Sequence, residues 1–302
     1  MNATLVAAFF LVGADTGATA DGFTVAVGGD VSLARGIAGR AISEGWDRVL
    51  APLRDALAGA DARIVNLESA TGTCVSAGSV QRPRLCGDFA ALASLVQSSI
   101  TAVTLANNHA LDAGESGLAA TVGALRAENV VVLGATSVRT GKPVAEPLGP
   151  LAVIAANLSH PAWPPGRAVP IPTPDDVGAS VRAARQAAPR RPVLVILHGG
   201  REMDPAPSSF EWMYARSAVD AGAAAVVFHG AHVARSVETV AGVPVHLGLG
   251  NLLFDQRAPG AARGQVLVLR FRPGEPAEIV EVRCLEAMTA LRCQCPNGTV
   301  QR

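Results

Sequence analysis

The sequence lacks clustered charge, paired-cysteine motifs and an excess of charged residues, and each absence excludes a class of protein. Its 25 Lys and Arg residues balance 25 Asp and Glu residues, and no basic cluster stands out. Nucleic acid is therefore not an expected partner, because it binds through clustered positive charge. None of the five Cys has the Cys-x-x-Cys spacing of a zinc knuckle. With 49% hydrophobic and 17% charged residues, the composition is typical of a well-buried globular protein.

The sequence also has no apolar run long enough to span a bilayer, which requires about 20 residues. The apolar stretch at 4–14 is shorter, and the small-x-small pattern ATA follows it at 18–20. We expect residues 1–20 to be a signal peptide and Asp21 to begin the mature chain. The protein would then be exported to the periplasm, the cell surface or the medium. Because the n-region has no Lys or Arg, an uncleaved anchor and a misassigned start codon remain alternatives.

The cysteines agree with export, because disulfides persist in oxidising compartments. Cys74 and Cys86 are predicted to close a short loop. Cys284 is predicted to pair with either Cys293 or Cys295, which leaves one thiol over. The alternative is that all five are unpaired thiols.

Strand-like and helix-like segments alternate along the chain, which predicts an α/β fold. No internal repeat or interdomain linker is visible, so residues 21–302 are expected to form one domain. A proline-rich connection at 161–174 is predicted to be a surface loop or lid. The expected helices lie at 48–60, 88–97, 114–128, 176–188 and 208–222. The expected strands lie at 63–68, 100–107, 129–135, 151–159, 192–198, 224–229, 243–249, 265–271 and 277–285.

Five of the strand-like runs end on side chains of the kind that bind metals. The runs are TVAVGGD, RIVNLE, AVTLANNH, PVLVILH and AVVFHGAH, and their terminal polar residues are Asp30, Glu68, Asn108, His109, His198, His229 and His232. Because the carboxyl ends of strands in an α/β sheet converge on one edge, we expect these side chains to meet. Mixed oxygen and nitrogen donors without Cys favour Mn²⁺, Fe or Zn²⁺ over Ca²⁺ or a sulfur-ligated ion.

Each of these features alone has a simpler interpretation. The glycines before Asp30 are compatible with an ordinary turn, and Glu68 with a salt bridge at a strand end, where a lone carboxylate would be costly. The segment ANNHALDAG is more specific, because successive Asn107, Asn108 and His109 cannot serve an apolar core. There, Asn and His could bind a metal and donate a proton, while Asp112 shapes the turn.

The order of the motifs GGDVSLAR, NLES, ANNHALDAG, the block from LHGGRE to FHGAHV, and GLGNLLFDQ resembles that of the capsule-synthesis CapA family. The resemblance covers about residues 25–256 and leaves a C-terminal β tail at 264–302. That family is associated with poly-γ-glutamate and looks like a branch of the calcineurin-type metallophosphoesterases. The resemblance implies a four-layer α/β/β/α sandwich with mixed sheets and a metal site at the strand ends.

Residue by residue, the resemblance implies a metal site holding one or two ions, with His109 as the general acid. The implied ligands are Asp30, Glu68, Asn108, His198 and His232, with His229 as a possible substitute. Supporting or substrate-contacting roles are expected for Asn107, Asp112, Glu202, Asn251 and Asp255. An anionic polymer or phosphoester is the implied substrate, and a membrane-bound polymer synthase is a possible partner.

Three positions depart from the phosphoesterase pattern. Val31-Ser32 follows Asp30 where that pattern has a second ligand, Gly230 replaces the first His of a His-Pro-His motif, and Gly199 replaces an aromatic residue. Two functions therefore stay open. One is a metal-dependent hydrolase or transferase acting on an extracytoplasmic polymer or phosphoester. The other is a non-catalytic polymer-binding or export-assembly module with an eroded metal site.

Overall fold

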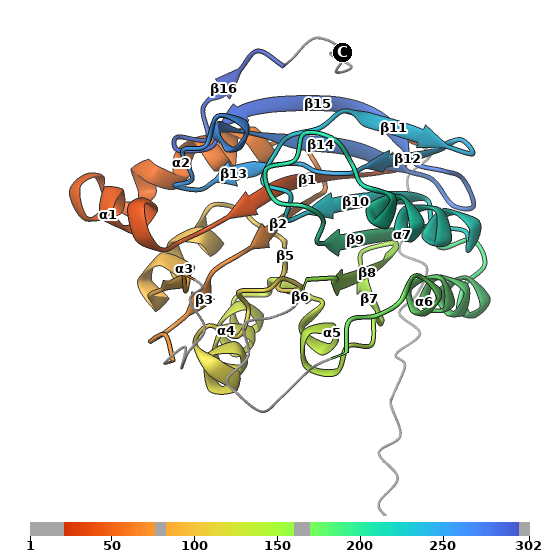
Figure 1. Ribbon diagram of the computed structural model, residues 1–302, viewed down its shortest axis with the longest axis horizontal. Helices are drawn as coiled ribbons and strands as arrows, with labels where there is room; N and C mark the ends of the chain where they lie inside the picture. Colours follow the sequence, from red (N-terminus) through yellow and green to blue (C-terminus); the bar gives the residue numbers. More distant parts are fainter. Residues whose placement is uncertain (1–20, 76–82, 160–169, 296–302) are drawn as a thin grey trace, which may run out of the picture.

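The computed structural model describes residues 21–75, 83–159 and 170–295 (Figure 1). The predicted signal peptide, and residues 161–169 of the proline-rich connection, lie outside these ranges. Two large mixed sheets and flanking helices make up the described part (Figure 1). This arrangement confirms the predicted α/β class, while the four-layer stacking in its exact form stays a prediction. Within the described ranges, no helix combines the length and the apolar character needed to cross a membrane.

The first sheet has the order β16-β15-β14-β1-β2-β5-β6, with β13 pairing to β1 beside this path. Strands β1, β2, β5 and β6 run parallel, whereas the C-terminal strands β14 to β16 join antiparallel. The alternating tail thus extends this sheet, as expected from its pattern. The strands are β1 (Phe23–Val31), β2 (Ala62–Leu67), β5 (Ala102–Thr104), β6 (Val131–Leu133), β13 (Asn251–Leu253), β14 (Arg263–Phe271), β15 (Glu278–Glu286) and β16 (Arg292–Cys293).

The second sheet has the order β11-β12-β10-β9-β8-β7, in which β8, β9, β10 and β12 are parallel. A separate pair, β3 (Ala70–Thr71) with β4 (Cys86–Gly87), follows the end of β2. The strands of the second sheet are β7 (Ala145–Leu148), β8 (Leu151–Asn157), β9 (Val193–His198), β10 (Ala225–His229), β11 (Val237–Val240) and β12 (Val243–His246).

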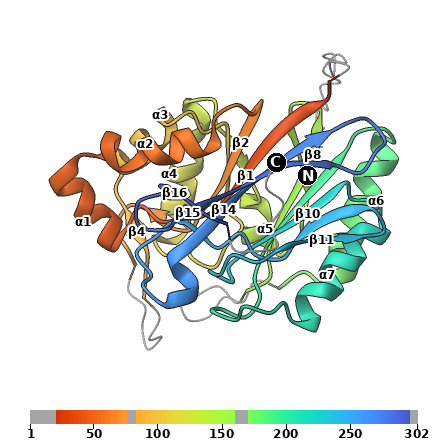
Figure 2. The ribbon, with the colours of Figure 1, turned by 90° about the horizontal axis from the view of Figure 1, so that it is seen from above.

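Alternate residues of the second sheet enter two different cores. Leu194 and Ile196 of β9 belong to a core shared with the first sheet, whereas Val195 and Leu197 pack in a core shared with helices α6 and α7. This period of two is the pattern of a strand that is covered on both faces. Figure 2 shows helices α1 to α4 on the first sheet's side and α6 and α7 on the other. The helices are α1 (Arg35–Glu44), α2 (Trp46–Leu57), α3 (Phe89–Gln97), α4 (Gly114–Ala127), α5 (Ala135–Thr140), α6 (Pro174–Ala187) and α7 (Ser209–Asp220).

Two differences from the sequence-based elements shape the site. The strand expected at 100–107 ends at Thr104 in β5, and residues 105–113 turn back toward the sheet. The strand expected at 243–249 ends at His246, after which Gly248 and Gly250 have positive φ angles of 158° and 69°. Residues 247–250 carry the chain from β12 of the second sheet to β13, which pairs with β1.

Candidate metal centre

Asp30 lies at the end of β1 in close contact with the bend that leads into β13. A Cβ atom on Gly29 would lie 2.1 Å from the carbonyl oxygen of Gly250, so only glycine fits before Asp30. The Asp30 amide donates a hydrogen bond to that same carbonyl at 2.9 Å. The Asp30 side chain is fully buried and accepts hydrogen bonds from Asn66 Nδ2 at 2.7 Å and from the Gly230 amide at 3.2 Å.

Glu68 follows β2 and is the carboxylate on which two imidazoles converge. Its Oε1 atom lies 3.5 Å from Nε2 of His198 and 3.6 Å from Nε2 of His232. All three side chains are almost fully buried. Oxygen and nitrogen donor atoms of Asp30, Glu68 and His198 lie within 4.8 Å of one another. A carboxylate between imidazole nitrogens in a buried cluster is a donor set suited to a divalent cation.

His198 connects the two sheets at the end of β9. Its Nε2 atom lies 3.0 Å from Oδ1 of Asn108, which comes from the turn after β5. Its Nδ1 atom lies 3.2 Å from Nδ2 of Asn66, near the end of β2. The turn residue Asn107 donates to Asn66 Oδ1 at 3.0 Å and to the Leu67 carbonyl at 2.8 Å, so it fixes this turn against β2.

His232 reaches the cluster from the segment after β10. Its backbone has a positive φ of 57°, an uncommon conformation for a residue with a side chain. Its Nδ1 atom lies 2.8 Å from Oδ1 of Asn251 and 3.4 Å from Oδ2 of Asp30. Because an amide oxygen only accepts, the Asn251 contact places the proton on Nδ1 and leaves Nε2, on the Glu68 side, as a metal-binding lone pair.

The spacing of these atoms fits ligands around a common ion. Donor atoms about 2.1 Å from one metal lie roughly 3.0 Å apart in octahedral and 3.4 Å apart in tetrahedral geometry. The contacts of His198 Nε2 with Asn108 and Glu68, at 3.0 and 3.5 Å, and that of His232 Nε2 with Glu68, at 3.6 Å, lie close to these values. The cluster therefore fits a divalent metal. Its core is Asp30, Glu68 and His198, and Asn108 and His232, which contact His198 and Glu68, are the further candidate ligands.

His229 lies outside this cluster. Although it is directly opposite His198 in the β9–β10 pairing, its Nε2 atom contacts the carbonyl oxygen of Gly28 at 2.9 Å. Desolvation lowers the pKa of His229, and the Asp30 charge and the Gly28 carbonyl only partly oppose this shift. His229 is therefore a neutral side chain that contacts β1 through Gly28. It does not take the place of the first His of the His-Pro-His motif, the position that Gly230 occupies here.

His109 forms a pair with Asp112 beside the candidate ligand Asn108. Its Nδ1 atom lies 2.7 Å from Oδ2 of Asp112, and its backbone amide donates to Asn107 Oδ1 at 3.1 Å. Asp112 is 1% exposed. A buried carboxylate at Nδ1 holds the proton on that nitrogen and orients the ring, the arrangement that positions many acid–base histidines.

Two of the predicted supporting residues lie elsewhere. Glu202 is exposed on the loop after β9. Asp255 forms an ion pair with Arg35 and accepts from the Gly36 amide at 3.0 Å, so it holds the beginning of α1. Sequence reasoning missed Asn66, which contacts Asp30, His198 and Asn107. The signal was an amide between two apolar residues, Val65 and Leu67, inside the strand RIVNLE.

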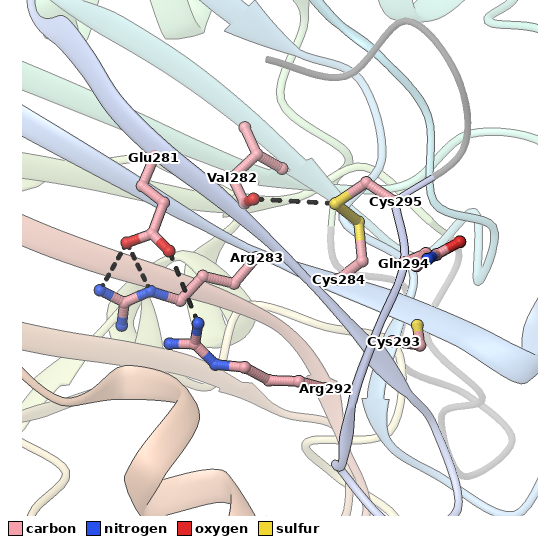
Figure 3. A pocket seen from close by; sticks show the side chains of 8 residues that line it. All are labelled: Glu281, Val282, Arg283, Cys284, Arg292, Cys293, Gln294 and Cys295. Carbon is pink, nitrogen blue, oxygen red and sulfur yellow. Dashed lines mark hydrogen bonds and ion pairs between the residues drawn. A yellow bond between two sulfur atoms is a disulfide. The ribbon is translucent and has the colours of Figure 1, made fainter. Parts of the chain in front are cut away.

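The structure joins Cys74 to Cys86 and Cys284 to Cys295, which leaves Cys293 as the free thiol. Cys293 lies opposite Cys284 in the β15–β16 ladder, yet Cys295 is the partner. Burial raises the pKa of the Cys293 thiol. Figure 3 shows a surface pocket around this second disulfide, where Glu281 pairs with Arg283 and Arg292. None of the candidate metal ligands lines it.

The fold and the cluster together define an α/β protein with a candidate metal centre at the strand ends. The model of the family described as bacterial capsule synthesis protein PGA_cap matches residues 24–256. The chain belongs to this capsule-synthesis family, the CapA family. The metallophosphoesterase resemblance is consistent with that membership.

Curated relatives support the same grouping. The PGA biosynthesis protein CapA of Bacillus subtilis (strain 168) is 29% identical over 169 residues, which cover 54% of this chain and 44% of the relative. Probable polyglutamine synthesis accessory proteins of two Mycobacterium tuberculosis strains, CDC 1551 and H37Rv, are each 29% identical over 198 residues. Those matches cover 57% of this chain and 51% of the relative. The chain therefore aligns with about half the length of the curated relatives.

Proposed function

We propose that the protein is an exported CapA-type accessory protein that acts on a capsule or poly-γ-glutamate-like polymer with a divalent metal. The observation that carries the proposal is the Glu68 carboxylate oxygen within 3.6 Å of two imidazole nitrogens, those of His198 and His232. Three relatives are named for PGA or polyglutamine synthesis, which supports a polymer as the substrate. The metallophosphoesterase resemblance supports a phosphoester as the alternative substrate. An accessory role also implies a polymer synthase at the membrane as partner.

The reaction class supported by the site is hydrolysis or group transfer. Asp30, Glu68, Asn108, His198 and His232 would hold Mn²⁺, Fe or Zn²⁺. A divalent ion in this position supplies Lewis-acid polarisation of the substrate and a nucleophile at neutral pH. His109, oriented by Asp112, would protonate the leaving group.

Export is supported by two features of the chain. The first is the N-terminal segment with the pattern of a signal peptide at residues 1–20. The second is the pair of disulfides, Cys74–Cys86 and Cys284–Cys295, because such bonds persist in oxidising compartments.

The first test is the metal content of the purified mature protein, measured by elemental mass spectrometry after reconstitution with Mn²⁺, Fe²⁺ or Zn²⁺. We expect about one ion per chain, and its loss in the His198→Ala/His232→Ala double variant, because two of the five candidate ligands are removed. The matched control is His246→Asn. His246 is fully buried like the two ligands, but it contacts Gln265 at 2.8 Å instead of the cluster.

The control variant should retain the metal. Two ions per chain would indicate dinuclear, phosphoesterase-like chemistry. Absence of metal from the reconstituted parent protein would contradict the proposed metal site. Equal metal content in the parent and the double variant would show that the ions bind elsewhere.

A second prediction concerns His109. With Mn²⁺ bound, the protein should hydrolyse an alkyl phosphodiester, and His109→Ala should lower kcat about 100-fold or more, because general acid catalysis contributes roughly 10²–10⁴-fold. Steady-state kinetics with equal metal occupancy in both proteins provides the measurement. Equal rates would contradict the role of His109 as proton donor.

The second candidate function is a polymer-binding or export-assembly module that holds a metal without turnover. The observation that favours it is the position of His229, whose Nε2 atom faces the Gly28 carbonyl rather than the cluster. His229 then adds no donor for a second ion. Stoichiometric metal without hydrolysis of any polymer or phosphodiester would support this function over the enzyme.

A further inference from the structure

Both ends of the loop that the Cys74–Cys86 disulfide closes form hydrogen bonds with Asp112. On the first side, the amide of Val75, next to Cys74, donates to the Asp112 carbonyl at 2.9 Å. On the second side, the amide of Leu85, next to Cys86, donates to Asp112 Oδ2 at 2.7 Å. The disulfide links these two ends. Asp112 is thus bound at its backbone and its side chain by one covalently closed segment.

Arg84 adds the countercharge on the same side. Its NH1 atom lies 3.7 Å from Asp112 Oδ1 and 3.4 Å from the Asp112 carbonyl. The Arg84 side chain is 9% exposed and that of Asp112 is 1% exposed, so water screens this pair little. Leu85 is buried against Ala34 and Phe254, which anchors the loop end on the body of the protein.

The Asp112 oxygen that accepts from Leu85 is also the one that contacts His109. Oδ2 lies 2.7 Å from both the Leu85 amide and His109 Nδ1. Movement of the loop end therefore moves the atom that orients the imidazole. The parallel pair β3–β4, with Ala70 opposite Cys86, ties the loop to the chain just after Glu68.

We propose that Arg84, held in place by the Cys74–Cys86 disulfide, is a positioning residue for His109 and acts through Asp112. The inference rests on the proposed function where it gives His109 the role of proton donor. Arg84 holds the Asp112 carboxylate in the position in which its Oδ2 atom faces Nδ1 of His109. The disulfide keeps Arg84 and Leu85 against that carboxylate. The site would then be fully competent only when this bond is formed.

The first experiment reads the His109 ring directly and needs no turnover. In the ¹⁵N-labelled, Zn²⁺-loaded protein at alkaline pH, two-bond ¹H–¹⁵N spectra report which ring nitrogen carries the proton. The loss of signals in a His109→Gln variant assigns them. We expect one tautomer, protonated on Nδ1, in the parent protein. In Arg84→Met and in Cys74→Ser/Cys86→Ser, we expect a mixture of the two tautomers of His109. In Arg84→Lys, the fraction protonated on Nδ1 should lie between that of these variants and that of the parent.

Matched controls separate this effect from a general loss of structure. Arg283→Met removes another partly buried guanidinium, which bonds the Ala56 carbonyl at 2.7 Å. Cys284→Ser/Cys295→Ser removes the other disulfide. Both should leave the His109 signals unchanged. A single Nδ1-protonated tautomer in both Arg84→Met and Cys74→Ser/Cys86→Ser would overturn the proposal.

The second experiment measures catalysis with two leaving groups. Arg84→Met should lower kcat about 10- to 100-fold for an alkyl phosphodiester and much less for a nitrophenyl ester, because a poor leaving group depends more on the proton donor. Adding Arg84→Met to His109→Ala should cause no further loss, since residues that act as one unit are not additive. Additive losses would overturn the positioning role. If the tautomer changes but no variant or parent turns over, the positioning role stands and the proposed enzymatic function fails.

Discussion

Glu68→Gln is expected to abolish the stabilisation that a bound divalent metal would give to the protein. At a free metal concentration about a hundredfold above Kd, binding adds about 2.7 kcal/mol to the free energy of unfolding, which raises Tm by about 5 to 10 °C. An amide replacing the carboxylate between His198 and His232 removes one of the two anionic candidate ligands, the one that both imidazoles face, so this increase should disappear. Thermal unfolding with and without Mn²⁺ or Zn²⁺ provides the measurement.

The same variant should behave differently without metal. Glu68 and Asp30 are two buried carboxylates in one cluster, with ligand atoms within 4.8 Å, and like charges at this distance repel. We therefore expect metal-free Glu68→Gln to be at least as stable as the metal-free parent. Glu146→Gln is the control, because Glu146 is partly buried and bonds the Gly134 amide away from the cluster. A full metal-induced increase in Tm in Glu68→Gln would contradict its role as a ligand.

The second large effect is expected at the buried ion pair between Arg235 and Glu211. Arg235 is 5% exposed and Glu211 fully buried, and Arg235 also donates to the carbonyls of Leu247 at 2.6 Å and Asp204 at 2.7 Å. Glu211 completes the capping box of α7 with Ser208. Removing one charge leaves the other buried without compensation, so Arg235→Met should lower the free energy of unfolding by about 3–5 kcal/mol.

Two further variants test this explanation by chemical denaturation. Arg270→Met breaks an ion pair with Glu278 whose side chains are 30% and 45% exposed, and it should cost at most about 1 kcal/mol. The double variant Arg235→Met/Glu211→Leu should recover much of the lost stability, because no uncompensated charge remains. A loss in Arg235→Met no larger than that in Arg270→Met would show that the buried pair contributes little.

The sequence predicted helices that have clear capping residues and apolar spacing. It did not predict short elements, such as strands that form only by pairing with a distant strand. The helix expected at 88–97 begins after an Asp88 side chain that caps it, and it is observed as Phe89–Gln97. Helix α5 is only six residues long, flanked by Gly134 and Gly141, and it had no detectable period. Strand β13 was missed because its three residues form a strand only by pairing with β1.

In the candidate site too, the sequence predicted the residue types but not where every side chain lies. Polar residues at the ends of apolar strands predicted which residue types could meet, and the structure brings Asp30, Glu68, Asn108, His198 and His232 together. Glu202 and Asp255 share a motif with such residues in sequence, but a few residues of chain direct their side chains elsewhere. Proximity in sequence near a strand end does not determine side-chain direction.

The sequence by itself determined the α/β alternation, the polar residues at the strand ends and the family, because these depend on local periodicity and on the order of short motifs. Only the tertiary structure decided that Cys284 pairs with Cys295, that His229 contacts Gly28 rather than the cluster, and that Asn66 belongs to the site. The disulfide depends on the register of β15 with β16, whereas the other two outcomes depend on distances between residues far apart in the chain. Such distances are set by how two sheets pack, which no local pattern encodes.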